Sequence, residues 1–198
     1  MILCIEIFVL ILFPLFVYLW RLPNSYIFLI PMEIAIFVLF IILSYWQRIP
    51  RKDLGIRNDT LHTWRIYFVV TLVIVILFYI FLEPRGIPRW KSVNVVSIYL
   101  IGNVMSSILQ EYIFRWYGLY KLSKYFTSPR ISILINGLLF AWVHIMFPDS
   151  LRFLPYAFVV WVIWARLRTR YPNLYLMILS HIALNLLVTG YWFFHVTI

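Results

Sequence analysis

Apolar residues dominate this chain in seven long runs, which short polar connections separate. A helix needs about 20 mostly apolar residues to cross a bilayer, and runs of 16 to 29 residues can serve as such helices. Prolines punctuate the connections between them. The pattern predicts an all-α fold, a polytopic membrane helix bundle with about seven transmembrane helices. The runs cover residues 2–20, 26–46, 66–83, 93–121, 131–147, 152–167 and 174–193.

The composition supports the same class. Of the 198 residues, 64% are hydrophobic and 12% are charged, whereas soluble domains are about half apolar and a quarter charged. Since the runs leave no room for a soluble domain, we expect residues 1–198 to form a single integral membrane domain. The first run lacks a basic start and a cleavage site, so it predicts a retained span rather than a signal peptide. The single cysteine, Cys4, excludes an internal disulfide.

The net charge of +10 could indicate nucleic-acid binding. However, the basic residues gather in alternate loops, where they orient membrane spans and meet anionic headgroups. We therefore expect the lipid bilayer as a partner and no nucleic acid. The more basic loops face the cytoplasm, which predicts an N-in/C-out orientation. Those loops contain Arg48, Arg51, Lys52, Arg57, Arg65, Arg115, Lys121, Lys124, Arg130, Arg166, Arg168 and Arg170.

Three short polar signatures interrupt the apolar runs. Ionisable residues inside a membrane are costly, so they usually serve a function. Carboxylates and imidazoles are also the groups that move protons and activate water. The signatures are therefore the strongest indication of function. They are Gln110-Glu111-x-x-x-Arg115, Phe140-x-x-x-His144 and His181-x-x-x-Asn185.

One face of the predicted fourth helix is polar, because Asn103, Ser107, Glu111 and Arg115 recur every four residues. This face should point to the protein interior, since lipid offers no hydrogen bonds. Glu111 precedes Arg115 by one turn, which is the favourable order for an ion pair. If the helix continues beyond Arg115, the three signatures reach similar depths. We then expect one buried site, open towards the cytoplasmic half of the bilayer.

Two further polar residues lie within predicted spans. Asn136 shares a face with His144 and is expected to hydrogen-bond between helices. Glu33 has no obvious partner, and two interpretations stay open: a pair with an interior arginine, or part of an ion path. A small transporter with a proton path through Glu33, Glu111 and the histidines is accordingly one alternative function.

The polar signatures resemble those of the CPBP family of intramembrane endopeptidases. This family includes the CAAX prenyl proteases and the Abi-like bacteriocin-processing or bacteriocin immunity proteins. The similarity covers about residues 52–190, and three motifs in the usual order are more specific than any one of them. The matching stretches are KDLGIR at 52–57, QEYIFR at 110–115, FAWVH at 140–144 and HIALN at 181–185.

The resemblance implies a metalloendopeptidase-like hydrolase in a bacterial plasma membrane. Its substrate would be a membrane-embedded or lipid-anchored peptide or protein, such as a prenylated or leader peptide. In such enzymes a glutamate and the first histidine activate water, and the second histidine and the asparagine bind the oxyanion. Carried over, the catalytic residues would be Glu111, His144, His181 and Asn185, with Gln110 and Arg115 in support.

The expected cofactor is none, with zinc as the alternative. Glu111, His144 and His181 together could ligate zinc, although their spacing is not that of an HExxH motif.

The chain departs from the family pattern at its first motif. The glutamate that usually has the catalytic role is Gln110 here, and an amide cannot act as a general base. Either Glu111 takes over, or the chain is a non-catalytic immunity or binding protein that keeps the fold. For Glu111 itself, a structural ion pair with Arg115 is the alternative role.

Overall fold

Helices form nearly all of the computed structural model, which describes residues 10–12, 14–16, 26–81, 87–88, 93–146, 150–189 and 195–196. The long helices are α2 (Tyr26–Trp46), α3 (Trp64–Phe81), α4 (Val93–Gln110), α6 (Pro129–Val143), α7 (Ser150–Arg170) and α8 (Leu174–Leu184). Shorter helical segments are η1 (Leu61–Thr63), η2 (Glu111–Gly118), α5 (Leu119–Tyr125), η3 (His144–Met146) and η4 (Asn185–Thr189). An antiparallel pair joins β1 (Ile87–Pro88) to β2 (His195–Val196).

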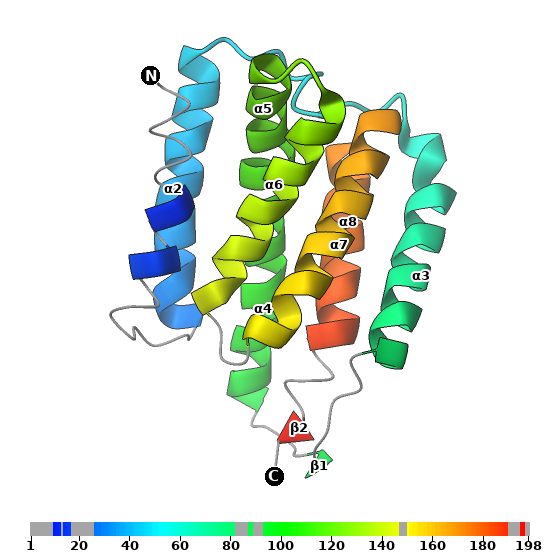
Figure 1. Cartoon of the computed structure of the whole chain (residues 1–198). Helices are drawn as coiled ribbons and strands as arrows, with labels where there is room; N and C mark the ends of the chain where they lie inside the picture. The colour runs from blue at the N-terminus through cyan, green and yellow to red at the C-terminus, as the bar shows by residue number, and fades with distance from the viewer. Residues whose placement is uncertain are drawn as a thin grey trace.

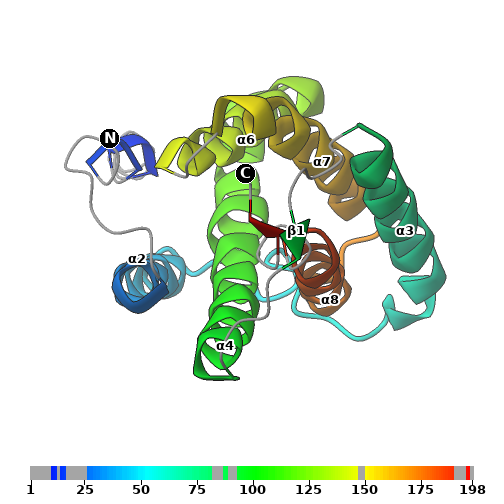
Figure 2. The same ribbon diagram turned by 90° about the horizontal axis from the view of Figure 1, so that it is seen from below.

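The helices run side by side, and the connections after α2, α5 and α7 meet at one end of the bundle (Figure 1). This is the end at which the more basic loops gather, as the alternation of charge along the chain predicts. Viewed along the bundle, α4 lies in the middle, with α2 on one side and α8 on the other (Figure 2). Because α4 is central, one of its faces packs against α8 and another packs against α2.

Six of the predicted apolar runs form helices at nearly the predicted positions. The second run coincides with α2, and the third, sixth and seventh begin within two residues of α3, α7 and α8. The first run, 2–20, lies mostly outside the described residues, apart from helical turns at 10–12 and 14–16. The helical bundle is therefore confirmed, whereas the number of membrane crossings stays a prediction.

Within the described residues, one helix is both long and apolar enough to cross a membrane unaided. It covers Leu61–Ile80. Shorter apolar helices cover Pro31–Trp46, Pro129–Val143 and Leu174–Leu187. The other two long helices are less apolar: α4 has a polar face, and α7 contains several arginines.

The outer face of α3 is apolar and exposed. Phe68, Val69 and Ile80 are each more than half exposed, while Tyr67 and Phe78 on the opposite face are buried. Soluble monomers rarely expose apolar patches this extensive. The outer face of α3 therefore suits contact with lipid chains.

The fourth predicted run forms one continuous helix that extends beyond Arg115. The three signatures can converge only if it does. It passes from α4 through η2 into α5, with no break at residues 110–119. In η2 the backbone takes the wider π-helical form, and such segments often occur at functional sites. The carbonyl oxygen of Phe114 in η2 accepts a hydrogen bond from Asn136 Nδ2 at 2.7 Å, which ties α6 to the wide turn.

The connection between α2 and α3 covers the basic end of the bundle and contains the KDLGIR stretch. Gly55 has a positive φ of 69° and lies flat against the ring of Trp116. Its carbonyl oxygen accepts from the Leu174 N–H at 3.0 Å, which fixes the start of α8. Arg168 stacks its guanidinium 4.6 Å from the Trp116 ring and donates to the Asp53 carbonyl oxygen. Through these contacts the KDLGIR stretch holds the end of α7 and the start of α8 beside Trp116 of η2.

Replacing Gly55 should destabilise this end of the bundle. A Cβ at position 55 would lie 1.9 Å from Trp116 Cζ3, and the backbone conformation disfavours any other residue. We expect Gly55→Ala to lower the midpoint of thermal unfolding in detergent by several degrees. Gly118→Ala is the comparison variant, because its Cβ would lie 3.1 Å from the Ile113 carbonyl oxygen, a tight contact but a much milder one. Equal midpoints for the two variants would contradict this packing.

Candidate active site

The polar face of α4 and η2 points into the bundle, as predicted. The side chains of Glu111, Arg115 and Ser107 are 0% exposed, and Asn103 is 3% exposed. None of them contacts lipid, so the protein itself must satisfy their hydrogen bonds. The site is assembled from the partners that do so.

Glu111 and Arg115 form a fully buried ion pair. Arg115 Nη1 donates to both carboxylate oxygens of Glu111, one turn earlier in the helix. Two buried charges are stable only when their geometry is good and other contacts help to compensate for desolvation. The structural ion pair expected as the alternative role of Glu111 is therefore present.

Two tryptophans of α7 stack on the guanidinium of Arg115. The Arg115 Cζ atom lies 3.6 Å from the centroid of the Trp161 ring and 4.9 Å from that of Trp164. A cation over an indole face is attracted by the ring, most strongly when water is excluded. The stacking matters because Arg115 Nε and Nη2 are buried without a hydrogen-bond partner among the described residues.

His181 completes the buried network from α8. Its Nδ1 atom lies 2.7 Å from Glu111 Oε1, and the side chain is 4% exposed. A carboxylate only accepts, so Nδ1 carries the proton and donates. This bond fixes the orientation of the imidazole and its tautomer. Glu111, which belongs to the first signature, is thus hydrogen-bonded to the third.

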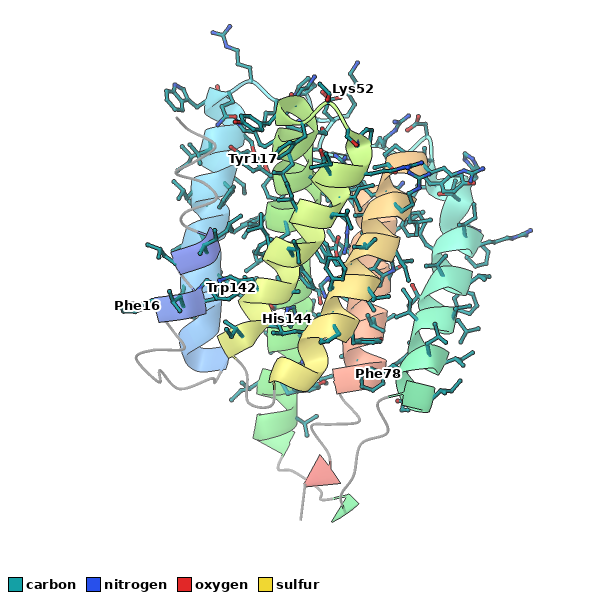
Figure 3. The ribbon with its side chains drawn as sticks, viewed as in Figure 1. Phe16, Lys52, Phe78, Tyr117, Trp142 and His144 are labelled. Carbon is teal, nitrogen blue, oxygen red and sulfur yellow. The ribbon has the colours of Figure 1, made fainter. Side chains whose placement is uncertain are left out.

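His144 lies in the lower half of the bundle, at the end of α6 (Figure 3). Its Nδ1 donates to the Phe140 carbonyl oxygen at 2.9 Å, one turn earlier. In the neutral ring, the lone pair is then on Nε2. Phe140 connects the two histidines, since its ring centroid is 4.7 Å from that of His144 and 6.2 Å from that of His181. The second and third signatures therefore share one aromatic wall.

Asn185 binds back to the polar face of α4. Its Nδ2 donates to Ser107 Oγ at 3.0 Å, and Ser107 Oγ donates to the Asn103 carbonyl oxygen at 2.7 Å. In the opposite direction, Tyr99 OH donates to the Asn185 carbonyl oxygen at 3.4 Å. These bonds hold the end of α8 against α4, one turn beyond His181.

Gln110 is the predicted site residue that lies apart from the others. It points to α2, where its Nε2 donates to Ser106 Oγ at 2.6 Å and to Glu33 Oε1 at 3.5 Å. Consecutive helical residues differ by about 100° around the axis, so Gln110 and Glu111 face different neighbours. A pair with an interior arginine was one of two interpretations left open for Glu33; in the part of the chain that the structure describes, its hydrogen bonds are to Ser106 and Gln110 instead.

Asn136 has the predicted role of an interhelical link. Besides the bond to the Phe114 carbonyl, its Oδ1 accepts from Trp161 Nε1 at 2.5 Å. Trp161 also stacks on Phe140, with centroids 3.4 Å apart and rings nearly parallel. Sequence reasoning missed Trp161 and Trp164, although their spacing of three places them on one helix face.

No three His, Cys, Asp or Glu side chains come together to hold a metal ion within the described part of the chain. The carboxylate of Glu111 is bound to a guanidinium, and a cation beside Arg115 would be repelled. The arrangement of Glu111, His144 and His181 in this structure therefore does not fit a metal centre. Zinc binding stays a prediction of the sequence.

Residues 92–187 match the family model described as Type II CAAX prenyl endopeptidase Rce1-like. The match includes all three polar signatures and the helices that carry them. This match supports assignment of the chain to the CPBP family. The family is one of membrane-embedded proteases, which agrees with the helical bundle and its lipid-facing α3. Searches of curated proteins and of solved structures found no match.

Removing the arginine of the buried ion pair should destabilise the helical bundle strongly. Arg115→Met leaves the Glu111 carboxylate buried without its countercharge, which typically costs about 3–5 kcal/mol. We expect a clearly lower midpoint of thermal unfolding in detergent. The double variant Arg115→Met/Glu111→Gln removes both charges and should recover part of the loss. A double variant no more stable than the single one would argue against a charged pair.

Proposed function

We propose that this chain is an intramembrane endopeptidase that hydrolyses a peptide bond in a membrane-embedded or lipid-anchored substrate, such as a prenylated or leader peptide. The observation that carries the proposal is the convergence of the three signatures: Glu111 contacts His181, and Phe140 contacts both histidines. The family is a protease family, which supports the reaction type.

In the proposed mechanism, His144 polarises the attacking water. Its Nδ1–H is committed to a backbone carbonyl, so the basic nitrogen of the neutral ring is Nε2. Through this nitrogen the imidazole would accept a hydrogen bond from the water and so orient and polarise it. The rigid packing of Phe140 on Trp161 would hold this ring in place.

His181 and Asn185 would stabilise the oxyanion that forms at the substrate carbonyl. They lie one turn apart at the end of α8, so their side chains share a face. Since His181 Nδ1 already donates to Glu111, Nε2 can donate to an oxyanion only in the doubly protonated ring. The Glu111 carboxylate would stabilise that cation and orient it, which is a positioning role.

We further propose that the chain spans the membrane about seven times with its N-terminus in the cytoplasm. The basic loops gather at one end of the bundle, which supports that end as the cytoplasmic one. The site would then open towards the cytoplasmic half of the bilayer. A bacterial plasma membrane is the proposed location.

A non-catalytic immunity or binding protein with the same fold is the second candidate. Gln110 favours it, since the amide replaces the carboxylate of the family motif. Such a protein would work by binding a membrane peptide, so Glu111→Ala and His144→Ala variants that still fold would protect as the wild type does. A protease would lose its effect in both variants.

Cleavage of a panel of membrane-anchored peptides by the purified protein tests the endopeptidase. We expect His144→Ala to lower the rate at least about 100-fold, because the attacking water would lose the group that orients and polarises it. His62→Ala is the matched control, because this histidine is exposed in the short helix η1 and its side chain hydrogen-bonds to the Asp59 carbonyl oxygen. Cleavage unaffected by His144→Ala would contradict the mechanism. A chelator added to the wild type tests the zinc alternative in the same assay.

A further inference from the structure

Glu33 of α2 places a carboxylate beside the amide of Gln110. Its Oε1 accepts from Ser106 Oγ at 3.1 Å and from Gln110 Nε2 at 3.5 Å. Gln110 Nε2 also donates to Ser106 Oγ, so the three side chains form a closed polar cluster between α2 and α4. The cluster lies at the family position where the catalytic glutamate is missing.

The second oxygen of Glu33 is buried, and among the described residues it has no hydrogen-bond partner. Leaving such a group unsatisfied costs about 1–3 kcal/mol, more when it is charged. Natural proteins usually satisfy these atoms with a partner or an ordered water. The unsatisfied Oε2 atom therefore points to a bound polar molecule.

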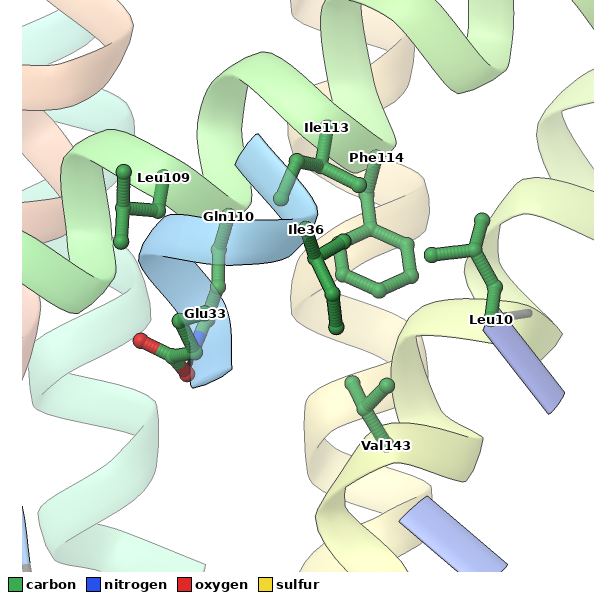
Figure 4. A pocket seen from close by; sticks show the side chains of 8 residues that line it. All are labelled: Leu10, Glu33, Ile36, Leu109, Gln110, Ile113, Phe114 and Val143. Carbon is green, nitrogen blue, oxygen red and sulfur yellow. Dashed lines mark hydrogen bonds between the residues drawn. The ribbon is translucent and has the colours of Figure 1, made fainter. Parts of the chain in front are cut away.

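A small cavity of about 30 Å³ adjoins this cluster. An enclosed water needs about 10–15 Å³ measured in the same way, so the cavity can hold one. Glu33 and Gln110 are its polar lining, as Figure 4 shows. Val143, which directly precedes His144, lines the same cavity from α6. The other lining residues are Leu10, Ile36, Leu109, Ile113 and Phe114.

Glu111 is poorly suited to the role that Gln110 leaves vacant. Its two oxygens accept from Arg115, and one of them also accepts from His181. Both oxygens of this carboxylate are therefore already engaged in the buried network with Arg115 and His181. Glu33 has only neutral partners, Ser106 and Gln110, and it retains an oxygen for water.

We propose that Glu33 supplies the catalytic carboxylate that position 110 lacks, and that it takes a proton from the attacking water. This inference rests on the proposed endopeptidase function. The water oxygen forms a bond to the substrate carbonyl carbon while one water proton passes to Glu33. When the tetrahedral intermediate collapses, the carbon–nitrogen bond breaks and the proton passes to the departing amine. Glu33 ends the cycle as the carboxylate.

Moving the carboxylate from residue 33 to residue 110 tests this assignment. We would compare cleavage of membrane-anchored peptides by the wild type, Glu33→Gln and the double variant Glu33→Gln/Gln110→Glu. We expect Glu33→Gln to lower kcat at least about 100-fold with KM changed less than about threefold. The double variant exchanges the amide and the carboxylate, so it should recover at least about tenfold of the lost rate.

Asp59→Asn is the matched control, because this exposed carboxylate pairs with Arg57 in a loop away from the cluster. It should cleave like the wild type. Thermal unfolding of each variant separates loss of chemistry from loss of the fold. If Glu33→Gln does not fold, the double variant decides: folded and active supports the assignment, and folded and inactive overturns it.

The other outcomes are also decisive. Wild-type cleavage that survives in folded Glu33→Gln overturns the role of Glu33 and leaves the endopeptidase standing. Silence in the wild type with cleavage by Gln110→Glu alone shows that position 110 needs its own carboxylate, so the role of Glu33 fails. If neither the wild type nor any variant cleaves a peptide, both the endopeptidase function and the role of Glu33 are overturned.

Discussion

The buried charge pair of Glu111 and Arg115 is the constraint on which the rest of the structure depends. Two charges removed from water are costly, and their mutual attraction compensates only when further contacts are well placed. Both charges lie in η2, and the further contacts come from two other helices: α7 stacks two indoles on the guanidinium, and α8 supplies the imidazole of His181. Any displacement of α7 or α8 would leave a charge unsatisfied, so the pair fixes the positions of both helices.

The charge pair also divides the central helix into two functional faces. The Glu111 face meets α7 and α8, whereas the Gln110 face meets Glu33 on α2. The wide π-helical segment η2 begins at Glu111, directly after Gln110. Asn136 of α6 donates a hydrogen bond to the Phe114 carbonyl oxygen of this segment. The Glu111 face thus orients His181, while the Gln110 face adjoins the small cavity that Val143 also lines. Under the proposed mechanism, Glu111 would orient His181, and a different carboxylate, that of Glu33, would accept the proton.

Much of this arrangement was predictable from spacing. The recurrence of polar residues every four positions predicted the inward face and the Glu111–Arg115 pair, and the structure has both. The fourth apolar run, 93–121, predicted a helix that continues past Arg115, as it does. The partner of Glu33 was not predictable, because helix packing and not sequence distance brings Ser106 and Gln110 beside it. The indoles above Arg115 escaped notice for a related reason, since tryptophans in an apolar run look like ordinary packing residues. The π-helical turn has no sequence signal that we recognise.

Nitrogen NMR of His181 in lipid bilayers tests the central claim most directly. With ¹⁵N-labelled histidine, and with the His181 signals assigned by a His181→Gln variant, the account predicts a protonated Nδ1 in a strong hydrogen bond that is shielded from exchange with water. Glu111→Gln should shift that signal while the signals of His62 stay unchanged. A His181 ring protonated only at Nε2, or one whose Nδ1 signal ignores Glu111→Gln, would contradict the buried network.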